Sequence, residues 1–285
     1  MEVNCTRRVE WSEKELQHVN LEQLQQSTSS PEIDTLQLDR NELSSLHLPE
    51  WSPLHTLRDF SVGANQLAEF PTGLEQCPQL EYLDVSANRI ASVDHVCWEK
   101  WPKLRTCQLQ QNQLTHLPST LFQLPALRLL ALHSNQFEQW PEHFSSVSLR
   151  ELYLDHNHLT ILPESVTQLQ GLLTLDVSYN SIQTLPPVLL QMSSLRSLYV
   201  RNNVLHTVPE DWGALVWLQY LSLDANQLVS LPDSLYQLPK LRKITLTKNP
   251  WQEDLFRPSA FRTPCKVIST GNATTFPCAS PEDEN

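Results

Sequence analysis

The stretch from residue 127 to 137 reads Leu127-Arg-Leu-Leu130-Ala-Leu132-His-Ser-Asn135-Gln-Phe137 and decides the fold. Its first nine places form the pattern LxxLxLxxN. The fourth and sixth places, Leu130 and Leu132, point to one face of a short strand, while Ala131 between them points outward. Asn135 stands where the chain leaves the strand, and its amide can satisfy backbone groups that the turn leaves unpaired. The stretch therefore predicts one strand followed by one turn.

The same nine places recur along most of the chain, with the asparagine returning every 22 to 24 residues. Each unit continues into an LPxxL segment, where proline favours an extended or 3₁₀ conformation over an α-helix. A degenerate unit, with Lys14 in the asparagine place, precedes the regular ones. One unit has nothing to bury its leucines against, so the repetition predicts a stack of units. The repeated asparagines are Asn41, Asn65, Asn88, Asn112, Asn135, Asn157, Asn180, Asn203, Asn226 and Asn249.

These motifs resemble the leucine-rich repeat family over about residues 9–251, and the 23-residue period is similar to its intracellular, Ras-associated and plant-intracellular subclass. The resemblance implies an α/β solenoid, a leucine-rich repeat horseshoe with a parallel concave β-sheet and an irregular or 3₁₀ convex side. We expect residues 1–30 to form an N-terminal cap with the degenerate repeat and residues 31–251 to form ten repeats. Residues 252–285 are expected to form a C-terminal cap and a loose acidic tail.

Several bulky or unusual residues fall on places where the repeat expects a buried leucine. A tryptophan on such a place is more simply explained as packing than as a binding anchor. Trp217 and Phe122 are instead placed on the convex surface, and an extra residue near Val93 and Asp94 predicts a local irregularity. The residues expected in the core are Phe60, Trp101, Cys107, Trp140, Trp212 and Ile244.

The charge and hydropathy of the chain exclude some classes of partner. Asp and Glu number 32 against 20 Lys and Arg, a net charge of −12, which argues against nucleic acid as the main partner. No apolar run approaches the length of a membrane span, and the N-terminus shows no apolar signal-peptide core. We therefore expect a cytoplasmic protein without a membrane span, and a monomer.

The six cysteines leave an alternative open. Cys107 is expected in the core, and only Cys265 and Cys278 could be near neighbours in the fold, so reduced thiols in an intracellular protein are the favoured interpretation. A bridge there, or a glycan at Asn272, would instead indicate a secreted or host-translocated recognition module such as a bacterial effector.

No sequence motif points to chemistry. CxxC, HExxH, GxGxxG, GxSxG and phosphate-loop patterns are all missing from the sequence. His133, Asp155, His156 and His158 are the richest polar neighbourhood, but His156 and His158 leave their strand in different directions, whereas zinc needs three or four converging ligands. We therefore expect no enzyme, with no catalytic residues, no metal site and no cofactor.

The concave surface is the remaining candidate site. Tyrosines flanked by carboxylates and one arginine gather there, and protein interfaces favour tyrosine and arginine. A simpler explanation is that exposed strand places need polar residues and that tyrosine suits strands. Earlier repeats carry smaller side chains, such as Asp39 and Gly63, which fit binding less well. We predict a protein–protein interaction scaffold in intracellular signalling, with these partner-binding residues: Tyr153, Asp155, His156, Asp176, Tyr179, Tyr199, Arg201, Tyr220 and Asp224.

Overall fold

A computed structural model of the chain describes residues 8–19, 32–50, 52–140, 148–251, 265–270 and 272–276. The chain divides into two compact units, an N-terminal unit Met1–Gln136 and a C-terminal unit Phe137–Asn285. Both are built from the same repeat, and the boundary follows directly after the asparagine of one repeat, Asn135.

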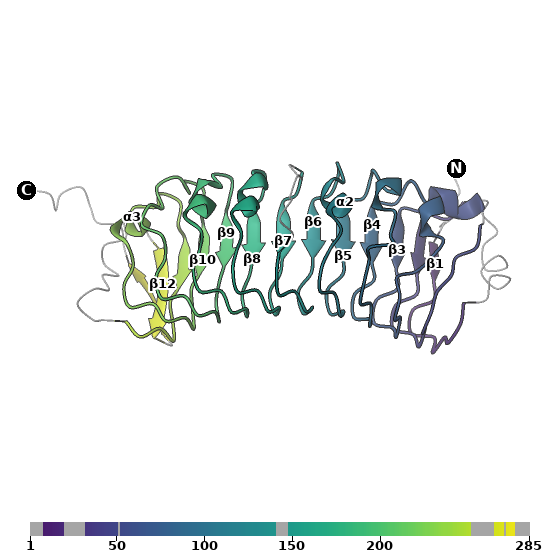
Figure 1. Cartoon of the computed structure of the whole chain (residues 1–285), viewed down its shortest axis with the longest axis horizontal. Coiled ribbons are helices and arrows are strands. Elements are labelled where there is room, and N and C mark those ends of the chain that lie inside the picture. The colour runs from purple at the N-terminus through teal and green to yellow at the C-terminus, as the bar shows by residue number, and fades with distance from the viewer. Residues whose placement is uncertain are drawn as a thin grey trace, which may run out of the picture. The chain divides into compact units, whose positions relative to one another are not determined.

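In the N-terminal unit, three-residue strands pair in parallel in chain order (Figure 1). The register keeps equivalent places of successive repeats side by side, so that Leu36 lies opposite Phe60 and Phe60 opposite Leu83. The middle residue of each strand is buried and its neighbours are mostly less so, which is the alternation that the sequence predicts. The strands are β1 (Arg8–Glu10), β2 (Thr35–Gln37), β3 (Asp59–Ser61), β4 (Tyr82–Asp84), β5 (Thr106–Gln108) and β6 (Leu129–Ala131).

The C-terminal unit repeats this parallel pairing and ends in one antiparallel pair, β12 with β13. Within the region expected to form a C-terminal cap and a loose tail, residues 252–285, a strand occupies Asn272–Phe276. The strands are β7 (Glu151–Tyr153), β8 (Thr174–Asp176), β9 (Ser197–Tyr199), β10 (Tyr220–Ser222), β11 (Lys243–Thr245), β12 (Cys265–Thr270) and β13 (Asn272–Phe276).

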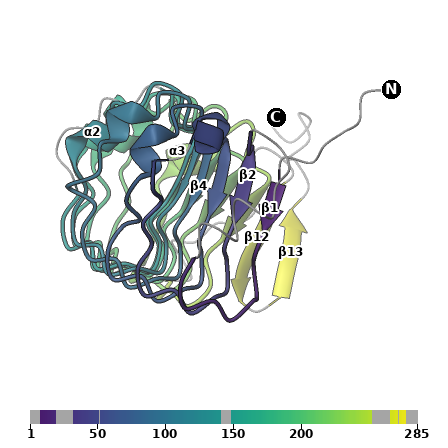
Figure 2. The ribbon, with the colours of Figure 1, turned by 90° about the vertical axis from the view of Figure 1, so that its right-hand side faces the viewer.

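Short helices lie on the side of each repeat opposite the strands, as the view along the stack shows (Figure 2). Most of those in the described residues are 3₁₀, and the expected fold class is confirmed. An extended proline precedes four of them, because proline fixes φ and starts the segment outside the helix. They are η1 (Ser52–Thr56), η2 (Leu74–Gln76), η3 (Trp98–Lys100), α2 (Ser119–Phe122), η4 (Glu164–Gln168), η5 (Pro187–Gln191) and α3 (Asp233–Tyr236), and none of the described helices is long and apolar enough to cross a bilayer.

The predicted core residues are buried, with relative exposures of 0 to 6%. Trp217 is 52% exposed, as expected, whereas the placement of Phe122 on the surface was wrong. Phe122 is the last residue of α2 and is fully buried, because the four-residue helix turns its aromatic ring toward the leucines beneath it. The core residues confirmed here are Phe60, Trp101, Cys107, Trp140, Trp212 and Ile244.

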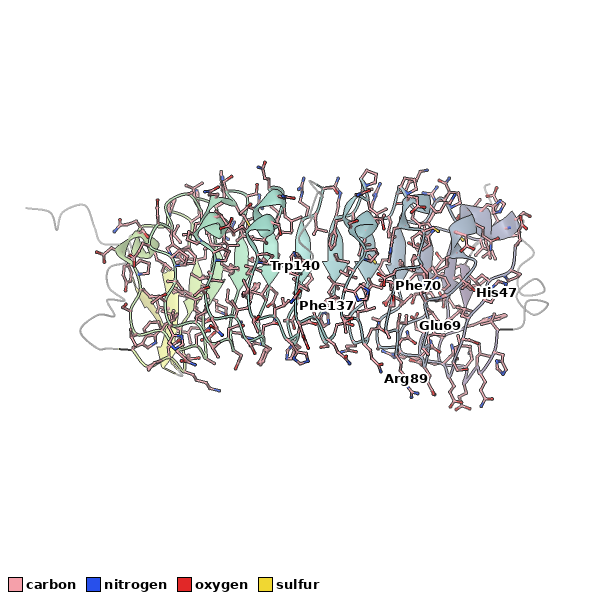
Figure 3. The ribbon with its side chains drawn as sticks, viewed as in Figure 1. His47, Glu69, Phe70, Arg89, Phe137 and Trp140 are labelled. Carbon is pink, nitrogen blue, oxygen red and sulfur yellow. The ribbon has the colours of Figure 1, made fainter. Side chains whose placement is uncertain are left out.

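The irregular repeat after Val93 contains a core residue that the sequence analysis missed. Trp98 begins η3, is fully buried, and packs edge-on against Trp101 with ring centroids 5.5 Å apart. Phe70, labelled in Figure 3, completes the cluster at 5.9 Å from Trp98 and 6.1 Å from Trp101. The extra residue therefore makes room for an aromatic cluster that replaces the usual leucines.

The repeated asparagines join each repeat to the one before it. Asn65 donates from Nδ2 to the carbonyls of Leu38 and Val62, both at 3.0 Å, and accepts the Leu43 N–H at 3.0 Å. These bonds satisfy buried backbone groups at the turn, as predicted from the sequence. The backbone just before each asparagine turns left-handed, with φ between 50° and 56°, at Arg40, Ala64, Ala87, Gln111, Ser134, His156, Tyr179, Asn202, Ala225 and Lys248.

The same ladder ties the degenerate first repeat to the regular ones. The Oδ1 atom of Asn41 accepts the N–H groups of Lys14 and Leu16 at 2.9 and 3.0 Å, and its Nδ2 donates to the Trp11 carbonyl at 2.7 Å. Val9 in β1 is buried in the register that the sequence analysis assigned to it. The unit that begins with Val9 thus covers the first regular repeat.

Candidate functional site

The outer face of the sheet in the C-terminal unit is the face that presents the third, fifth and seventh places of each repeat. Strand register brings Tyr153 opposite Asp176 and Asp176 opposite Tyr199 on the adjacent strands β7, β8 and β9 (Figure 1). Strand spacing of about 4.8 Å separates the two tyrosines by roughly 10 Å. These three predicted residues, which share the fifth place of their repeats, therefore form a row across neighbouring strands.

A stack of three side chains stands beside this row. The rings of His156 and Tyr179 are nearly parallel, with centroids 4.1 Å apart, and the Arg201 guanidinium lies 4.8 Å from the centre of the Tyr179 ring. Asp155 accepts a 2.8 Å contact from Nδ1 of His156. His156 and Tyr179 can stack because both occupy the left-handed eighth place, which turns their side chains out of the strand direction. The stack fixes the orientation of Arg201 by cation–π attraction.

Burial in the row changes the acidity of two of its members. The Tyr153 hydroxyl donates to Glu151 at 2.7 Å, and burial together with this charged acceptor raises the pKa of the phenol well above its ordinary value. Burial also raises the pKa of Asp176, with Asp155 adding to the rise, while hydrogen bonds from Ser178 oppose it. Tyr153 is therefore held neutral, and its hydroxyl is oriented by a neighbour within its own strand.

A hollow of about 470 Å³ opens at the C-terminal side of the row. Arg201, Tyr199 and Tyr220 line it, and so does Lys243, which the sequence analysis did not select. Lys243 occupies the third place of its repeat on β11, directly opposite Tyr220 on β10. Lys243 shares the third place of the repeat with Tyr220, and this shared place was the signal in the sequence that could have found it.

Asp224 is already engaged by the protein. Its Oδ1 accepts the N–H and the hydroxyl of Thr247, both at 2.8 Å, and its Oδ2 accepts the hydroxyls of Ser222, at 3.0 Å, and Thr245. These four bonds hold the floor of the hollow in place. Asp224 lies on the predicted surface, but both its oxygens already accept hydrogen bonds from the protein. Its side chain therefore stabilises the floor of the hollow.

The predicted residues thus lie on one surface of the C-terminal unit. Arg201 belongs both to the stack and to the lining of the hollow. Tyr153, Asp176 and Tyr199 form the row, and Tyr220, 37% exposed, stands at the far side of the hollow. We call the surface formed by the row, the stack and the hollow the tyrosine patch; it comprises Tyr153, Asp155, His156, Asp176, Tyr179, Tyr199, Arg201, Tyr220 and Asp224.

The N-terminal unit has a larger hollow, of about 700 Å³, over the smaller side chains of its first repeats. Gly63 lies in it, and a β-carbon there would come within 3.2 Å of carboxylate Oδ1 of Asp39 and 3.4 Å of that of Asp84. A side chain at this position would therefore crowd the polar groups of the neighbouring repeats. Within the described residues no group of three or more metal-ligating side chains converges in either unit.

Comparison with known families gives one match. A model of a leucine-rich repeat region matches residues 103–259, more than half of the chain. A search of the curated proteins found no match.

Several solved structures are similar to the chain. A leucine-rich repeat protein of Leptospira interrogans is 29% identical, with a TM-score of 0.65, over 82% of this chain and 66% of that one. The ectodomain of the Arabidopsis thaliana receptor kinase GASSHO1/SCHENGEN3, solved with CASPARIAN STRIP INTEGRITY FACTOR 2, is 25% identical, with a TM-score of 0.66, over 84% and 30%. A chain in the octameric complex of Latrophilin 3, Unc5D and FLRT2 has a TM-score of 0.71 over 92% and 90%, and at 20% identity it shows the fold alone.

Proposed function

Since the chain belongs to the leucine-rich repeat family, we propose that it is a protein-binding scaffold that holds a partner protein on the tyrosine patch. One observation carries the proposal: Tyr179 is stacked between His156 and Arg201 beside a hollow that two further tyrosines line. Rigid aromatic groups with polar ends, fixed before binding, lose little conformational entropy on association and are the usual anchors of protein interfaces.

The structural relatives support binding as the kind of activity. The similar plant receptor ectodomain was solved with a bound factor, and this chain spans only 30% of that ectodomain and 66% of the Leptospira protein. The family is typically a non-enzymatic binding module, which supports the proposal that the chain is no enzyme. A single copy of the chain suffices for this role, and we propose that it acts as a monomer.

We further propose that the protein acts in the cytoplasm, in signalling, as the 23-residue period suggests. Cys77, Cys97 and Cys107 are free thiols, and Cys97 is exposed, which supports a reducing compartment. The likeness to a receptor ectodomain is the observation that supports the alternative, an exported recognition module. Intact-mass measurement of native material distinguishes the two, because a Cys265–Cys278 bridge or a glycan at Asn272 would favour the alternative. Cys278 and both cysteine side chains lie outside what the structure describes.

Affinity capture from cell lysate tests the binding surface. Tyr153→Ala combined with Tyr199→Ala should abolish capture of the partner, at about 2 kcal/mol or more for each anchor. The control is Trp217→Ala with Ile161→Ala, two apolar residues that are 52% and 67% exposed and lie outside the patch. Both control residues are exposed, so their replacement should leave the core intact.

Thermal unfolding of both double variants shows whether each remains folded. Capture that survives the tyrosine changes but fails in the control would place the partner on the opposite side of the repeats. Capture that survives both changes would place it elsewhere on the chain, and either result refutes the proposed site.

A further inference from the structure

The sheet of the C-terminal unit carries an unusual concentration of positive charge near the tyrosine patch. Arg196, Gln219, Arg242 and Lys266 follow one another through backbone hydrogen bonds of 2.8 to 2.9 Å between successive repeats. Lys243 lies next to Arg242 and directly opposite Lys266, and it lines the hollow together with Arg201. We call the five exposed cations the basic stripe: Arg196, Arg201, Arg242, Lys243 and Lys266.

Several arginines of the N-terminal unit form ion pairs, whereas the cations of the basic stripe do not. In the N-terminal unit Arg40 pairs with Glu13 at 2.6 Å, and Glu81 pairs with Arg58 at 3.1 Å and with Arg105 at 3.5 Å. Among the residues that the structure describes, none of the five cations of the basic stripe forms an ion pair or donates a side-chain hydrogen bond. Arg40, Arg58 and Arg105 are thus paired with carboxylates of their own unit, whereas the cations of the basic stripe form no ion pair within the described residues and can meet the charges of another molecule.

The carboxylates nearest the stripe do not cancel it. Both carboxylate oxygens of Asp224 accept hydrogen bonds from Ser222, Thr245 and Thr247. Asp176 is partly buried and accepts the N–H of Ser178 at 2.9 Å. Arg201 is close enough to Asp176 to counter part of the rise in the pKa of that carboxyl, but within the described residues neither carboxylate forms an ion pair with the five cations, which stand in a chain whose net charge is −12. The basic stripe is therefore a positively charged surface on a negatively charged chain. Such a surface attracts acidic partners and repels basic ones.

We propose that the basic stripe and the hollow receive an acidic segment of the partner protein, with Asp or Glu side chains at Arg201 and Lys243 and the segment packed on Tyr199 and Tyr220. This inference rests on the proposed function and specifies the chemistry of the partner. Arg201 and Lys243 lie two strands apart and four places apart along the strand direction, a separation of about 16 Å between their backbones, which an extended peptide spans in about five residues. Charged hydrogen bonds to carboxylates fix the register of such a segment.

An acidic protein segment fits this surface better than nucleic acid does. The two carboxylates and the tyrosine hydroxyls in and beside the hollow tolerate a partner whose charges are spaced apart and whose other groups can accept or donate hydrogen bonds. A nucleic acid brings a continuous run of phosphates, which the carboxylates and the overall charge of −12 repel.

Fluorescence anisotropy with defined probes tests the proposal on the full chain. The probes are a labelled decapeptide of alternating Glu and Gly, a matched decapeptide of Gln and Gly, and a ten-nucleotide thymidine oligomer. The Glu peptide should bind at least about tenfold more tightly than the Gln peptide, and its affinity should fall as salt rises. Arg201→Gln with Lys243→Gln should weaken the Glu peptide about tenfold or more.

The matched control removes two positive charges from the other unit. Lys103→Gln with Arg128→Gln changes the net charge equally but leaves the basic stripe intact, so binding of the Glu peptide should stay within about twofold. An equal loss in the control would attribute binding to net charge and overturn the proposal. No binding of the Glu peptide up to about 1 mM, equal affinity for the Gln peptide, or tighter binding of the oligonucleotide would also overturn it.

The two proposals fail in different ways. If the tyrosine variant loses the captured partner but the Glu peptide does not bind, the binding scaffold stands and its acidic partner is refuted. If the Glu peptide binds at Arg201 and Lys243 while the tyrosine variant still captures its partner, the stripe stands and the tyrosine patch is refuted.

Discussion

Removing one asparagine of the ladder tests how the repeats hold together, and Asn203 is the most informative choice. Its Oδ1 accepts the N–H of Ile182 at 2.9 Å, and its Nδ2 donates to the carbonyls of Val177 at 3.0 Å and Val200 at 3.1 Å. Asn203 is 6% exposed and Ile182 is fully buried, so water does not replace these bonds readily. The change Asn203→Ala therefore removes a link between neighbouring repeats inside the core.

The magnitude follows from which groups keep another partner. The Val177 carbonyl still accepts from Asn180 at 3.0 Å and the Val200 carbonyl from Asn226 at 3.0 Å, so each loses only one bond, about 0.5–1.5 kcal/mol. The Ile182 N–H is left without an acceptor, at about 1–3 kcal/mol. We expect Asn203→Ala to lower the free energy of unfolding by about 2–6 kcal/mol.

Urea unfolding followed by circular dichroism measures this loss, and hydrogen exchange read by mass spectrometry locates it. Exchange should accelerate first in peptides that contain residue 182 and its neighbours, because repeats are stabilised by their neighbours. Gln183→Ala is the control. It removes the exposed side-chain amide next to Ile182 and should change the free energy of unfolding by no more than about 0.5 kcal/mol. A loss below 0.5 kcal/mol for Asn203→Ala, or uniform acceleration along the whole chain, would refute the ladder as a source of stability.

Two further predictions concern ionisable groups. Burial raises the pKa of Asp176 above its ordinary value of 3.8, so the folded state favours the protonated acid and loses stability as pH rises through the raised pKa. Asp176→Asn should therefore unfold at a higher urea concentration than wild type at pH 7, and the difference should shrink toward pH 4. A lower urea midpoint for the variant at pH 7 would contradict this. Iodoacetamide at about pH 8 should label Cys97 rapidly but not Cys77 or Cys107, because burial raises the pKa of Cys77 to about 12 and that of Cys107 further still; peptide mass spectrometry reads the labelling, and equal rates at the three thiols would show that the core opens readily.

Periodicity made most of the core predictable. Wherever a residue occupied a fixed place of the repeat, as Cys107 and Trp212 do, its burial followed from the place and not from its type. Predictions made outside the periodic places were weaker, and Phe122 shows why: its exposure depends on which way a four-residue helix turns. Trp98 was missed for a similar reason, because the inserted residue breaks the count that located the other core positions.

The candidate site was predictable as a set of columns but not as a set of contacts. The parallel register alone placed Tyr153, Asp176 and Tyr199 side by side. The stacking of Tyr179 on His156 depends on the left-handed backbone at both residues, which the sequence pattern does not specify for residues other than glycine.

The sequence by itself determined the repeat, the parallel strands, the buried asparagines and the side chains that share a face, because a fixed period converts directly into a fixed position. The tertiary structure decided how each charge is used. Among the described residues, Asp224 accepts four hydrogen bonds, whereas Arg201 and Lys243 form no ion pair, and this difference depends on side chains one or two repeats away. Charge pairing acts over a few ångströms between residues that stand about 23 places apart in the sequence, so only the folded stack reveals it.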